Sequence, residues 1–251
     1  MQNNYFIKTK IINLLEKPHK KSNISSQIIY GEKFKILSKN KNFYKIKSHY
    51  DNYIGFVSNK INIVHKFKPT HKIKVLKSRV YKGLENKKKI PLNKWLPFGS
   101  NIQMLKKEKS FFMFEKNKWI KLNEITSINN KDRNFVKIFK LFENCPYKWG
   151  GKTYQGIDCS ALIQIYYKYN NIFFPRDTIE QVKQKKKLKI KKKFKKGDII
   201  FWKGHVAACI NSKNLIHAYG PMKKVVIMPI QKTIHRIEKT ANLRVKKIFR
   251  I

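Results

Sequence analysis

The sequence has few acidic residues. Its 251 residues include 14 aspartates and glutamates against 58 lysines and arginines, which gives a formal net charge of +44 at pH 7. Lysine supplies nearly all of the excess and is spread along the chain with abundant Asn, Ile, Tyr and Phe, as an A+T-rich coding sequence produces. We interpret the charge mainly as such a bias and in smaller part as functional, because a positive field attracts acidic ligands.

Arginine is scarce, although its guanidinium is the preferred group for contacting phosphates and base edges. It occurs only at Arg79, Arg133, Arg176, Arg236, Arg244 and Arg250. We therefore expect no specific nucleic-acid partner.

Cysteine is rare as well. Cys145, Cys159 and Cys209 are odd in number and show no C-x-x-C spacing, which argues against a disulfide framework and against a zinc site. Free thiols fit a reducing compartment. The sequence also has no Gly-rich phosphate loop, dinucleotide fingerprint or EF-hand pattern, so we expect neither a metal nor a cofactor.

Long apolar runs are missing too. None reaches the length of a membrane span, and the segment Met1–Lys8 lacks the apolar core of a signal peptide. We expect a cytoplasmic protein, with an upstream start or another export route left open. The apolar content of 41% and the aromatic content of 13% are enough for globular cores, and the length allows two or three small domains.

One stretch has the features of a catalytic element. Glycines at 150, 151 and 156 allow tight turns, and they lead to Asp158-Cys159-Ser160 and then to apolar residues at a helical period. This places Cys159 in the first turn of a helix with Asp158 near its N-cap, where the macrodipole favours a thiolate, so we expect the thiol to ionise easily. The alternative is a buried structural cysteine.

Two histidines follow on predicted strands. His205 opens the apolar run 205–210, after a Gly-Asp turn and the strand 199–202, and His217 lies in the run 214–218. Histidines on successive strands can lie side by side. One could then take the proton of Cys159 while the second fixes its tautomer. Alternatively, His217 is a satisfied core residue.

These residues together resemble the NlpC/P60 family of cell-wall cysteine peptidases. The resemblance covers about residues 135–230 and keeps that family's order. It rests on Tyr147-x-Trp149-Gly150-Gly151, Asp158-Cys159-Ser160, Pro175-Arg176-Asp177-Thr178 with Gln181, Gly197-Asp198 with Phe201-Trp202, Gly204-His205-Val206 and His217-Ala218. Ala161 departs from the pattern, because the family usually has glycine after the serine.

The resemblance implies a papain-like α+β domain, in which the nucleophile helix packs on an antiparallel sheet. It implies hydrolysis of murein stem peptides, an acidic small-peptide substrate, at the bond between γ-D-glutamate and the diamino acid. The roles it assigns are nucleophile for Cys159, general base and acid for His205, and orienting third member for His217. Tyr147 would lie near the oxyanion. The residues facing the substrate would be Asp158, Ser160, Arg176, Asp177 and Thr178.

The N-terminal half reads as short strands with turns between them, at the spacing of small barrels. The predicted strands are 10–14, 26–30, 33–37, 43–46 and 53–57, and then 72–76, 101–105, 110–115 and 118–122. Residues 30–32, the pair 43–44 and residues 51–57 resemble bacterial SH3-type domains. We predict SH3-type barrels at 1–66 and, in degenerate form, at 67–128, followed by the peptidase domain at 129–251. In peptidases of this architecture the barrel closes the cleft around a free N-terminal L-alanine. The resemblance therefore implies that Asp158, together with Glu32 and Tyr53 from the first barrel, contacts that amine.

Two further segments have predicted structures. Residues 131–144 show a helical period and are expected to form the first helix of the peptidase domain. The lysine-dense tract 183–196 is expected to be a solvated connection rather than a binding patch.

Two functional hypotheses remain. In the first, the chain is a murein-peptide cysteine endopeptidase, which requires Cys159, His205 and His217 to converge. In the second, it is an inactive basic module that binds cell wall or polyanions. That role does not require the three residues to converge. The presence of all three catalytic residue types in order favours the enzyme.

Overall fold

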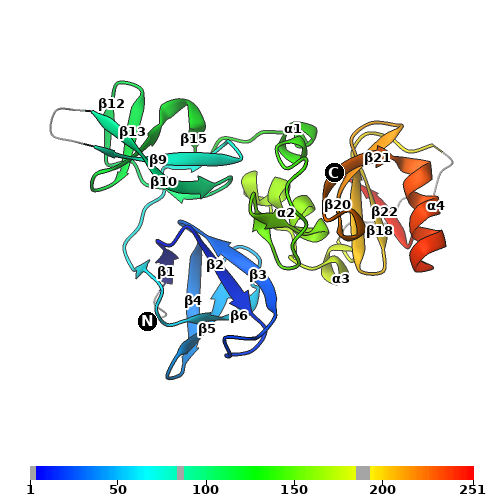
Figure 1. Cartoon of the computed structure of the whole chain (residues 1–251), viewed down its shortest axis with the longest axis horizontal. Coiled ribbons are helices and arrows are strands. Elements are labelled where there is room, and N and C mark those ends of the chain that lie inside the picture. The colour runs from blue at the N-terminus through cyan, green and yellow to red at the C-terminus, as the bar shows by residue number, and fades with distance from the viewer. Residues whose placement is uncertain (1–3, 84–87, 185–192) are drawn as a thin grey trace. The chain divides into compact units, whose positions relative to one another are not determined.

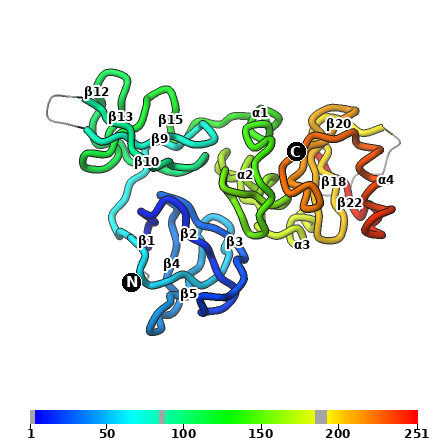
Figure 2. The backbone as a smooth tube through the Cα atoms, in the orientation of Figure 1, coloured from blue at the N-terminus to red at the C-terminus, as the bar shows by residue number. Residues whose placement is uncertain are grey.

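A computed structural model describes residues 4–83, 88–184 and 193–251. The chain forms two compact units, Met1–Lys131 and Asp132–Ile251. Helices and strands are labelled in Figure 1, and Figure 2 traces the path of the backbone. The first unit contains only strands and one short 3₁₀ turn among its described residues, whereas the helices lie in the second.

An antiparallel sheet of seven strands forms the first part of unit one, in the order β3-β2-β6-β5-β4-β1-β7. Alternate residues of its strands point into one apolar cluster that includes Ile7, Leu14, Phe34, Ile46 and Val57. This alternation is the pattern by which the sequence predicted strands here. The strands are β1 (Asn4–Ile7), β2 (Ile11–Leu15), β3 (Ile24–Ile29), β4 (Lys33–Lys39), β5 (Phe43–Ser48), β6 (Ile54–Ser58) and β7 (Ile63–Val64).

The second part of unit one has its own apolar cluster and two sheets, ordered β10-β9-β14-β13-β12 and β11-β8-β15. Its elements are β8 (His71–Ile73), β9 (Lys77–Gly83), β10 (Lys89–Pro97), β11 (Asn101–Ile102), β12 (Lys106–Glu108), β13 (Phe111–Glu115), β14 (Lys118–Lys121), η1 (Leu122–Glu124) and β15 (Ile125–Ser127).

This part differs from the prediction in several strands. The predicted strands 72–76 and 101–105 are shorter, ending at Ile73 and Ile102, while β9 and β10 were not predicted. The strand β10 was not predicted because it contains prolines, which are rare inside strands. Proline is tolerated here because β10 is an edge strand whose register shifts between Pro91 and Trp95, where a missing N–H breaks no ladder.

Tyr30 joins the two parts of unit one. Its side chain is buried in the second part's cluster, where its hydroxyl donates to Glu115 Oε1 at 2.6 Å and accepts from Lys8 Nζ at 2.6 Å. The next residue, Gly31, has φ +77°, and a Cβ there would come 2.0 Å from the carbonyl oxygen of Asn101. Only glycine allows this close approach.

Unit two consists of a five-stranded antiparallel sheet between helices, as Figure 1 shows. The strands run in the order β21-β20-β19-β18-β22; α2 packs on β19 and β20, and α4 covers the opposite face. The elements are α1 (Phe135–Lys140), β16 (Lys152–Thr153), β17 (Gly156–Ile157), α2 (Cys159–Tyr169), α3 (Thr178–Gln181), β18 (Asp198–Trp202), β19 (His205–Cys209), β20 (Asn214–Tyr219), η2 (Gly220–Met222), β21 (Lys224–Pro229), α4 (Ile230–Ala241) and β22 (Lys247–Arg250).

The first helix of unit two is shorter than the predicted 131–144. It begins at Phe135 because the Asn134 side chain accepts from the Lys137 amide at 3.1 Å, which is an N-cap. After Lys140 the chain turns, and Asn144 adopts φ +63°. Of the lysine-dense tract 183–196, residues 185–192 lie outside the described part of the chain.

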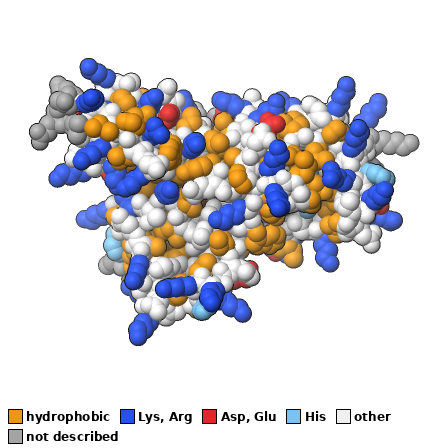
Figure 3. Space-filling view, in the orientation of Figure 1, with side chains coloured by type: hydrophobic (Ala, Val, Ile, Leu, Met, Phe, Trp, Pro, Cys, Tyr) orange, Lys and Arg blue, Asp and Glu red, His pale blue; other side chains and the backbone are white. Residues whose placement is uncertain are grey.

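Basic side chains are spread over the visible face of both units (Figure 3). Among the described residues, no helix is both long and apolar enough to cross a membrane.

Candidate active site

Cys159 is the first residue of α2, and Asp158 is its N-cap. The Asp158 Oδ1 accepts from the Ala161 amide at 2.8 Å, so the helix begins where the sequence predicted. Nearly every side of α2 is buried, which holds Cys159 and the helix N-terminus inside the domain. Ala161, the departure from the family pattern, is itself buried and fits this packing.

A buried ion pair supports this helix start. Arg176 Nη1 and Nη2 lie 3.0 and 2.5 Å from the two carboxylate oxygens of Asp158. Ser160 Oγ donates to Asp158 Oδ1 at 3.1 Å and accepts from Arg176 Nη1 at 2.7 Å, while the Gly150 amide donates to Oδ2 at 2.9 Å. In the free protein the three predicted substrate-facing residues thus bind one another. Their direct contact with the substrate stays a prediction.

Glycines 151 and 156 close the turn that leads into the site. A Cβ on Gly151 would lie 2.3 Å from the Gly156 carbonyl oxygen. Gly156 has φ +148°, and its own Cβ would lie 2.4 Å from the side chain of Lys148. The backbone can therefore fold beneath α2 only with glycine at these positions.

A tight turn places His205 at the start of β19. Trp202 pairs with His205 across the turn, and Gly204 adopts φ +74°, as the third residue of a type II turn requires. The Sγ of Cys159 lies 4.0 Å from the Gly204 carbonyl oxygen and accepts from the Val206 amide. The sulfur thus touches the backbone on both sides of His205, and the structure brings the predicted nucleophile and base together.

The two histidines contact one another. His205 Nε2 lies 2.9 Å from His217 Nδ1. His217 is fully buried and stacks on Tyr219, with ring centroids 4.6 Å apart and an angle of 14° between the planes. Since Nε2 of His205 is engaged, Nδ1 is the ring nitrogen left for the thiol.

The expectation of an easily ionised thiol is wrong for the free protein. Burial raises the pKa of Cys159 to about 12, and the adjacent Asp158 carboxylate adds to the increase. The amides of Val206 and Ser160 and the charge of Arg176 oppose it but are weaker. The helix N-terminus favours the thiolate less than burial disfavours it.

The base is neutral as well. Burial of the His205 ring lowers its pKa to about 4. The residue as a whole is only half-buried. The pKa of His217 lies well below its ordinary value. Burial is the larger cause, and the nearby His205 is the smaller one. At neutral pH the resting site therefore holds a thiol and two neutral imidazoles.

Tyr147 lies near the sulfur, as predicted for a residue close to the oxyanion. Its backbone bridges to Ile157, two residues before Cys159, and its pKa is raised first by burial and then by Cys159 and Asp158. The hydroxyl is therefore protonated at neutral pH and can donate a hydrogen bond.

The remaining predicted residues lie around the site or in the other unit. Asp177 is the N-cap of α3, and Thr178 begins that helix; both are half-buried. Glu32 and Tyr53 belong to unit one. The Glu32 Oε2 accepts from the Ile29 amide at 2.7 Å, and Tyr53 packs against the apolar cluster of the first sheet. The predicted contact of Glu32 and Tyr53 with the substrate stays a prediction.

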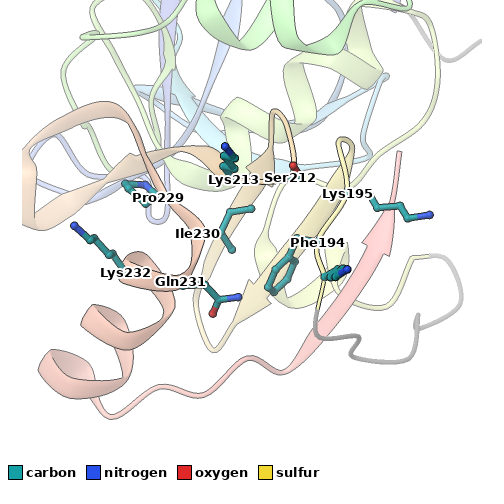
Figure 4. Close-up of a pocket in the computed structure, with 9 residues that line it drawn as sticks. Phe194, Lys195, Ser212, Lys213, Pro229, Ile230, Gln231 and Lys232 are labelled. Atoms are coloured by element: carbon teal, nitrogen blue, oxygen red, sulfur yellow. The ribbon is translucent and has the colours of Figure 1, made fainter.

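A separate cavity of about 720 Å³ lies where α4 begins (Figure 4). None of the predicted site residues lines it. Its walls are Phe194, Pro229, Ile230, Gln231 and Ser212 with four lysines, Lys193, Lys195, Lys213 and Lys232. Within the described ranges, no group of three His, Cys, Asp or Glu side chains is placed to hold a metal ion.

Three side chains contact the histidines, and sequence reasoning singled out only Trp202, as part of the family pattern, while it missed Tyr219 and Met228. Trp202 packs on His205 with ring centroids 5.6 Å apart, and Tyr219 stacks on His217. Met228 Sδ lies 3.4 Å from His217 Nε2. The alternation 215–217–219 could have indicated Tyr219, but nothing in the sequence pairs Met228 with His217, because β21 was not predicted.

Known proteins match both parts of this architecture. Residues 144–244 match the NlpC/P60 family, and residues 14–60 match the bacterial dipeptidyl-peptidase Sh3 domain. The chain is 36% identical over 86 residues to dipeptidyl-peptidase 6 of Lysinibacillus sphaericus, covering 34% of this chain and 31% of the relative. It is 28% identical over 113 residues to the gamma-D-glutamyl-L-lysine dipeptidyl-peptidase of Bacillus subtilis, covering 42% of this chain and 38% of the relative.

The matches thus span about a third of these curated relatives. The crystal structure of an NlpC/P60 family protein from Bacillus cereus resembles the chain with a TM-score of 0.82 at 19% identity, covering 98% of this chain and 99% of that one. At such identity the likeness shows the fold alone. Together the family matches show that this chain carries an NlpC/P60 family domain, at residues 144–244, behind a bacterial SH3 domain, at residues 14–60.

Proposed function

We propose that the chain is a cysteine endopeptidase that hydrolyses murein stem peptides at the γ-D-glutamyl–diamino acid bond. The observation that carries this proposal is the pairing of His205 with His217 at 2.9 Å, together with the contacts of the Cys159 sulfur to the backbone on both sides of His205. The name of the Bacillus subtilis relative, a gamma-D-glutamyl-L-lysine dipeptidyl-peptidase, supports the choice of bond. The helix-on-sheet packing around Cys159 is compatible with a papain-like arrangement.

In the first half of the reaction His205 removes the proton of Cys159 as the sulfur attacks the carbonyl carbon of the γ-glutamyl group. Because thiol and imidazole are both neutral in the resting site, this proton moves during the attack. The amide C–N bond then breaks, and His205 returns the proton to the departing amino group. A thioester to Cys159 remains.

In the second half His205 takes a proton from a water molecule that attacks the thioester. The C–S bond breaks, and the sulfur regains a proton. In both halves the negative oxygen is stabilised by donors near the sulfur, and we assign the Tyr147 hydroxyl to this role. The protonated state of Tyr147 at neutral pH supports that assignment.

The substrate would carry a free N-terminal L-alanine. The candidate contacts of its amine are Asp158, Glu32 and Tyr53, with Ser160, Arg176, Asp177 and Thr178 around the peptide. Asp158 already accepts hydrogen bonds at both oxygens, so in this proposal it acts mainly by fixing the start of α2 and the position of Arg176 and Ser160.

Hydrolysis of L-Ala-γ-D-Glu-L-Lys tests the function directly. The purified chain should release L-lysine from this tripeptide, as measured by mass spectrometry. Pretreatment with iodoacetamide at alkaline pH should abolish release. A chain that binds the peptide or an anionic polymer but releases no amino acid, from this peptide or its diaminopimelate analogue, would instead support the alternative of an inactive binding module.

A further inference from the structure

His217 has partners at both ring nitrogens. Its Nδ1 lies 2.9 Å from His205 Nε2, and its Nε2 lies 3.4 Å from the sulfur of Met228. The ring has no exposed surface, so water does not replace either partner. The protonation of each nitrogen is therefore set by the group beside it.

The two partners of His217 are chemically different. A thioether sulfur carries no hydrogen and can only accept, whereas a neutral imidazole has one donor and one acceptor nitrogen. The contact with Met228 is therefore a hydrogen bond only if His217 Nε2 carries the proton. In neutral His217 this leaves Nδ1 as an acceptor.

The tautomer of His217 constrains that of His205. If His217 Nδ1 accepts, then His205 Nε2 must be the donor in the contact between the rings. A neutral His205 that is protonated at Nε2 has its lone pair on Nδ1, the nitrogen left for the thiol of Cys159. One weak acceptor thus determines where the base of the site lies.

We propose that Met228 is a positioning residue that fixes the tautomers of both histidines and so makes Nδ1 of His205 the general base. The proposal rests on the proposed peptidase function for its kinetic consequence, but the tautomers themselves do not depend on any substrate. Without the acceptor, a proton on His217 Nδ1 would force His205 Nε2 to accept. His205 would then carry its proton on Nδ1, and the thiol would face an N–H.

The local structure holds Met228 in this position. His217 pairs with Val226 across β20 and β21, so Met228 is its diagonal neighbour two residues further along β21 on the same face. The Met228 side chain packs against the apolar cluster between the sheet and α4. Tyr219 stacks on the face of the His217 ring, which limits how far that ring can rotate.

The test uses the full chain with two substitutions at one position. Met228→Leu keeps the volume and removes the acceptor, while Met228→Gln supplies a carbonyl oxygen that can also accept. Met113 is a half-buried methionine in β13, far from the histidines in the sequence. Met113→Leu is therefore the control for replacing a methionine by leucine elsewhere in the chain. Long-range ¹H–¹⁵N spectra report which ring nitrogen of each histidine is protonated, and peptide hydrolysis gives kcat and KM.

We expect the parent chain, Met113→Leu and Met228→Gln to show His205 and His217 protonated at Nε2. Met228→Leu should show His217 with a substantial Nδ1-protonated form, and its kcat should fall about three- to tenfold, the effect of one neutral hydrogen bond. KM should stay within about twofold, because the change acts on the chemical step. Parent spectra with His217 protonated at Nδ1, or unchanged spectra in Met228→Leu, would overturn the proposal even if the chain hydrolyses no peptide.

A second background separates positioning from packing. In His217→Ala the ring that Met228 would orient is absent, so adding Met228→Leu should lower kcat no further. If the same loss appears in both backgrounds, Met228 acts only by packing and the proposal is wrong.

Discussion

Arg176 binds both carboxylate oxygens of Asp158, the residue that caps the helix carrying Cys159. Both side chains are almost entirely buried. A buried ion pair adds little net stability, but removing one partner leaves the other charge uncompensated. The pair therefore acts chiefly by fixing where α2 begins, and with it the position of the sulfur.

Substituting Arg176 should destabilise unit two strongly. Arg176→Met leaves the Asp158 carboxylate buried without its cation, at a cost of about 3–5 kcal/mol in the free energy of unfolding. Urea denaturation monitored by circular dichroism would measure the loss. The double variant Arg176→Met with Asp158→Asn should recover part of it. If Arg176→Met unfolded at the same urea concentration as the parent, the pair would have no supporting role.

Replacing the nucleophile should abolish turnover and leave folding intact. Cys159→Ser keeps the shape of the residue at the start of α2 but supplies a far weaker nucleophile. Tripeptide hydrolysis and the melting temperature should be measured together.

The other two cysteines provide the controls. Cys145→Ser and Cys209→Ser should keep turnover, although Cys209 is fully buried in β19 and a hydroxyl there costs about 1–3 kcal/mol. Parent-like turnover in Cys159→Ser would contradict the assignment of the nucleophile.

The two histidines should differ in the size of their effects. His205→Ala removes the base, whereas His217→Asn keeps an amide that can still hydrogen-bond to the His205 ring. We expect the alanine variant to lose about 10²- to 10⁴-fold in kcat, and the asparagine variant distinctly less. Single-turnover kinetics would show whether the loss lies in the chemical step. Small and equal losses would indicate a structural pair.

Alkylation of Cys159 in the free protein should be slow at neutral pH. Because burial raises the pKa of Cys159 from 9.0 to about 12, the reactive thiolate is scarce at pH 7. Its fraction, and with it the rate of iodoacetamide alkylation, should rise about tenfold per pH unit between pH 7 and 10. Mass spectrometry of the labelled peptide would measure the rate. A rate already constant between pH 6 and 9 would instead indicate a preformed thiolate–imidazolium pair.

Acetylating the substrate's amine should weaken hydrolysis. If the site recognises a free L-alanine, kcat/KM should fall by about 10-fold or more for the N-acetylated tripeptide, because the buried Glu32 carboxylate would lose its proposed ammonium partner. Glu32→Gln and Tyr53→Phe should reduce the discrimination between the two peptides. Equal rates on both peptides would mean that the amine is not recognised, and the N-terminal domains would then be better explained as wall-binding modules.

Much of the site follows from local sequence. Glycines before Asp158-Cys159-Ser160 predict a turn and a capped helix start, since N-capping and positive φ depend on neighbouring residues. Strands with alternating apolar residues, such as β5 and β6, were predicted close to their observed bounds. This alternation, too, is a property of neighbouring residues. In contrast, the prolines of β10 suggested no strand, and only its place at the edge of a sheet allows one there.

The tertiary structure decided the protonation states. By itself, the sequence placed Cys159 at a helix N-terminus and predicted an easily ionised thiol, because the macrodipole is a local property. Burial is not local: it depends on which segments pack around α2, and it reverses the shift in pKa. Likewise His205 and His217 were recognisable as a pair from their strands, but the contact with Met228 comes from the register of β20 against β21, which no local pattern encodes.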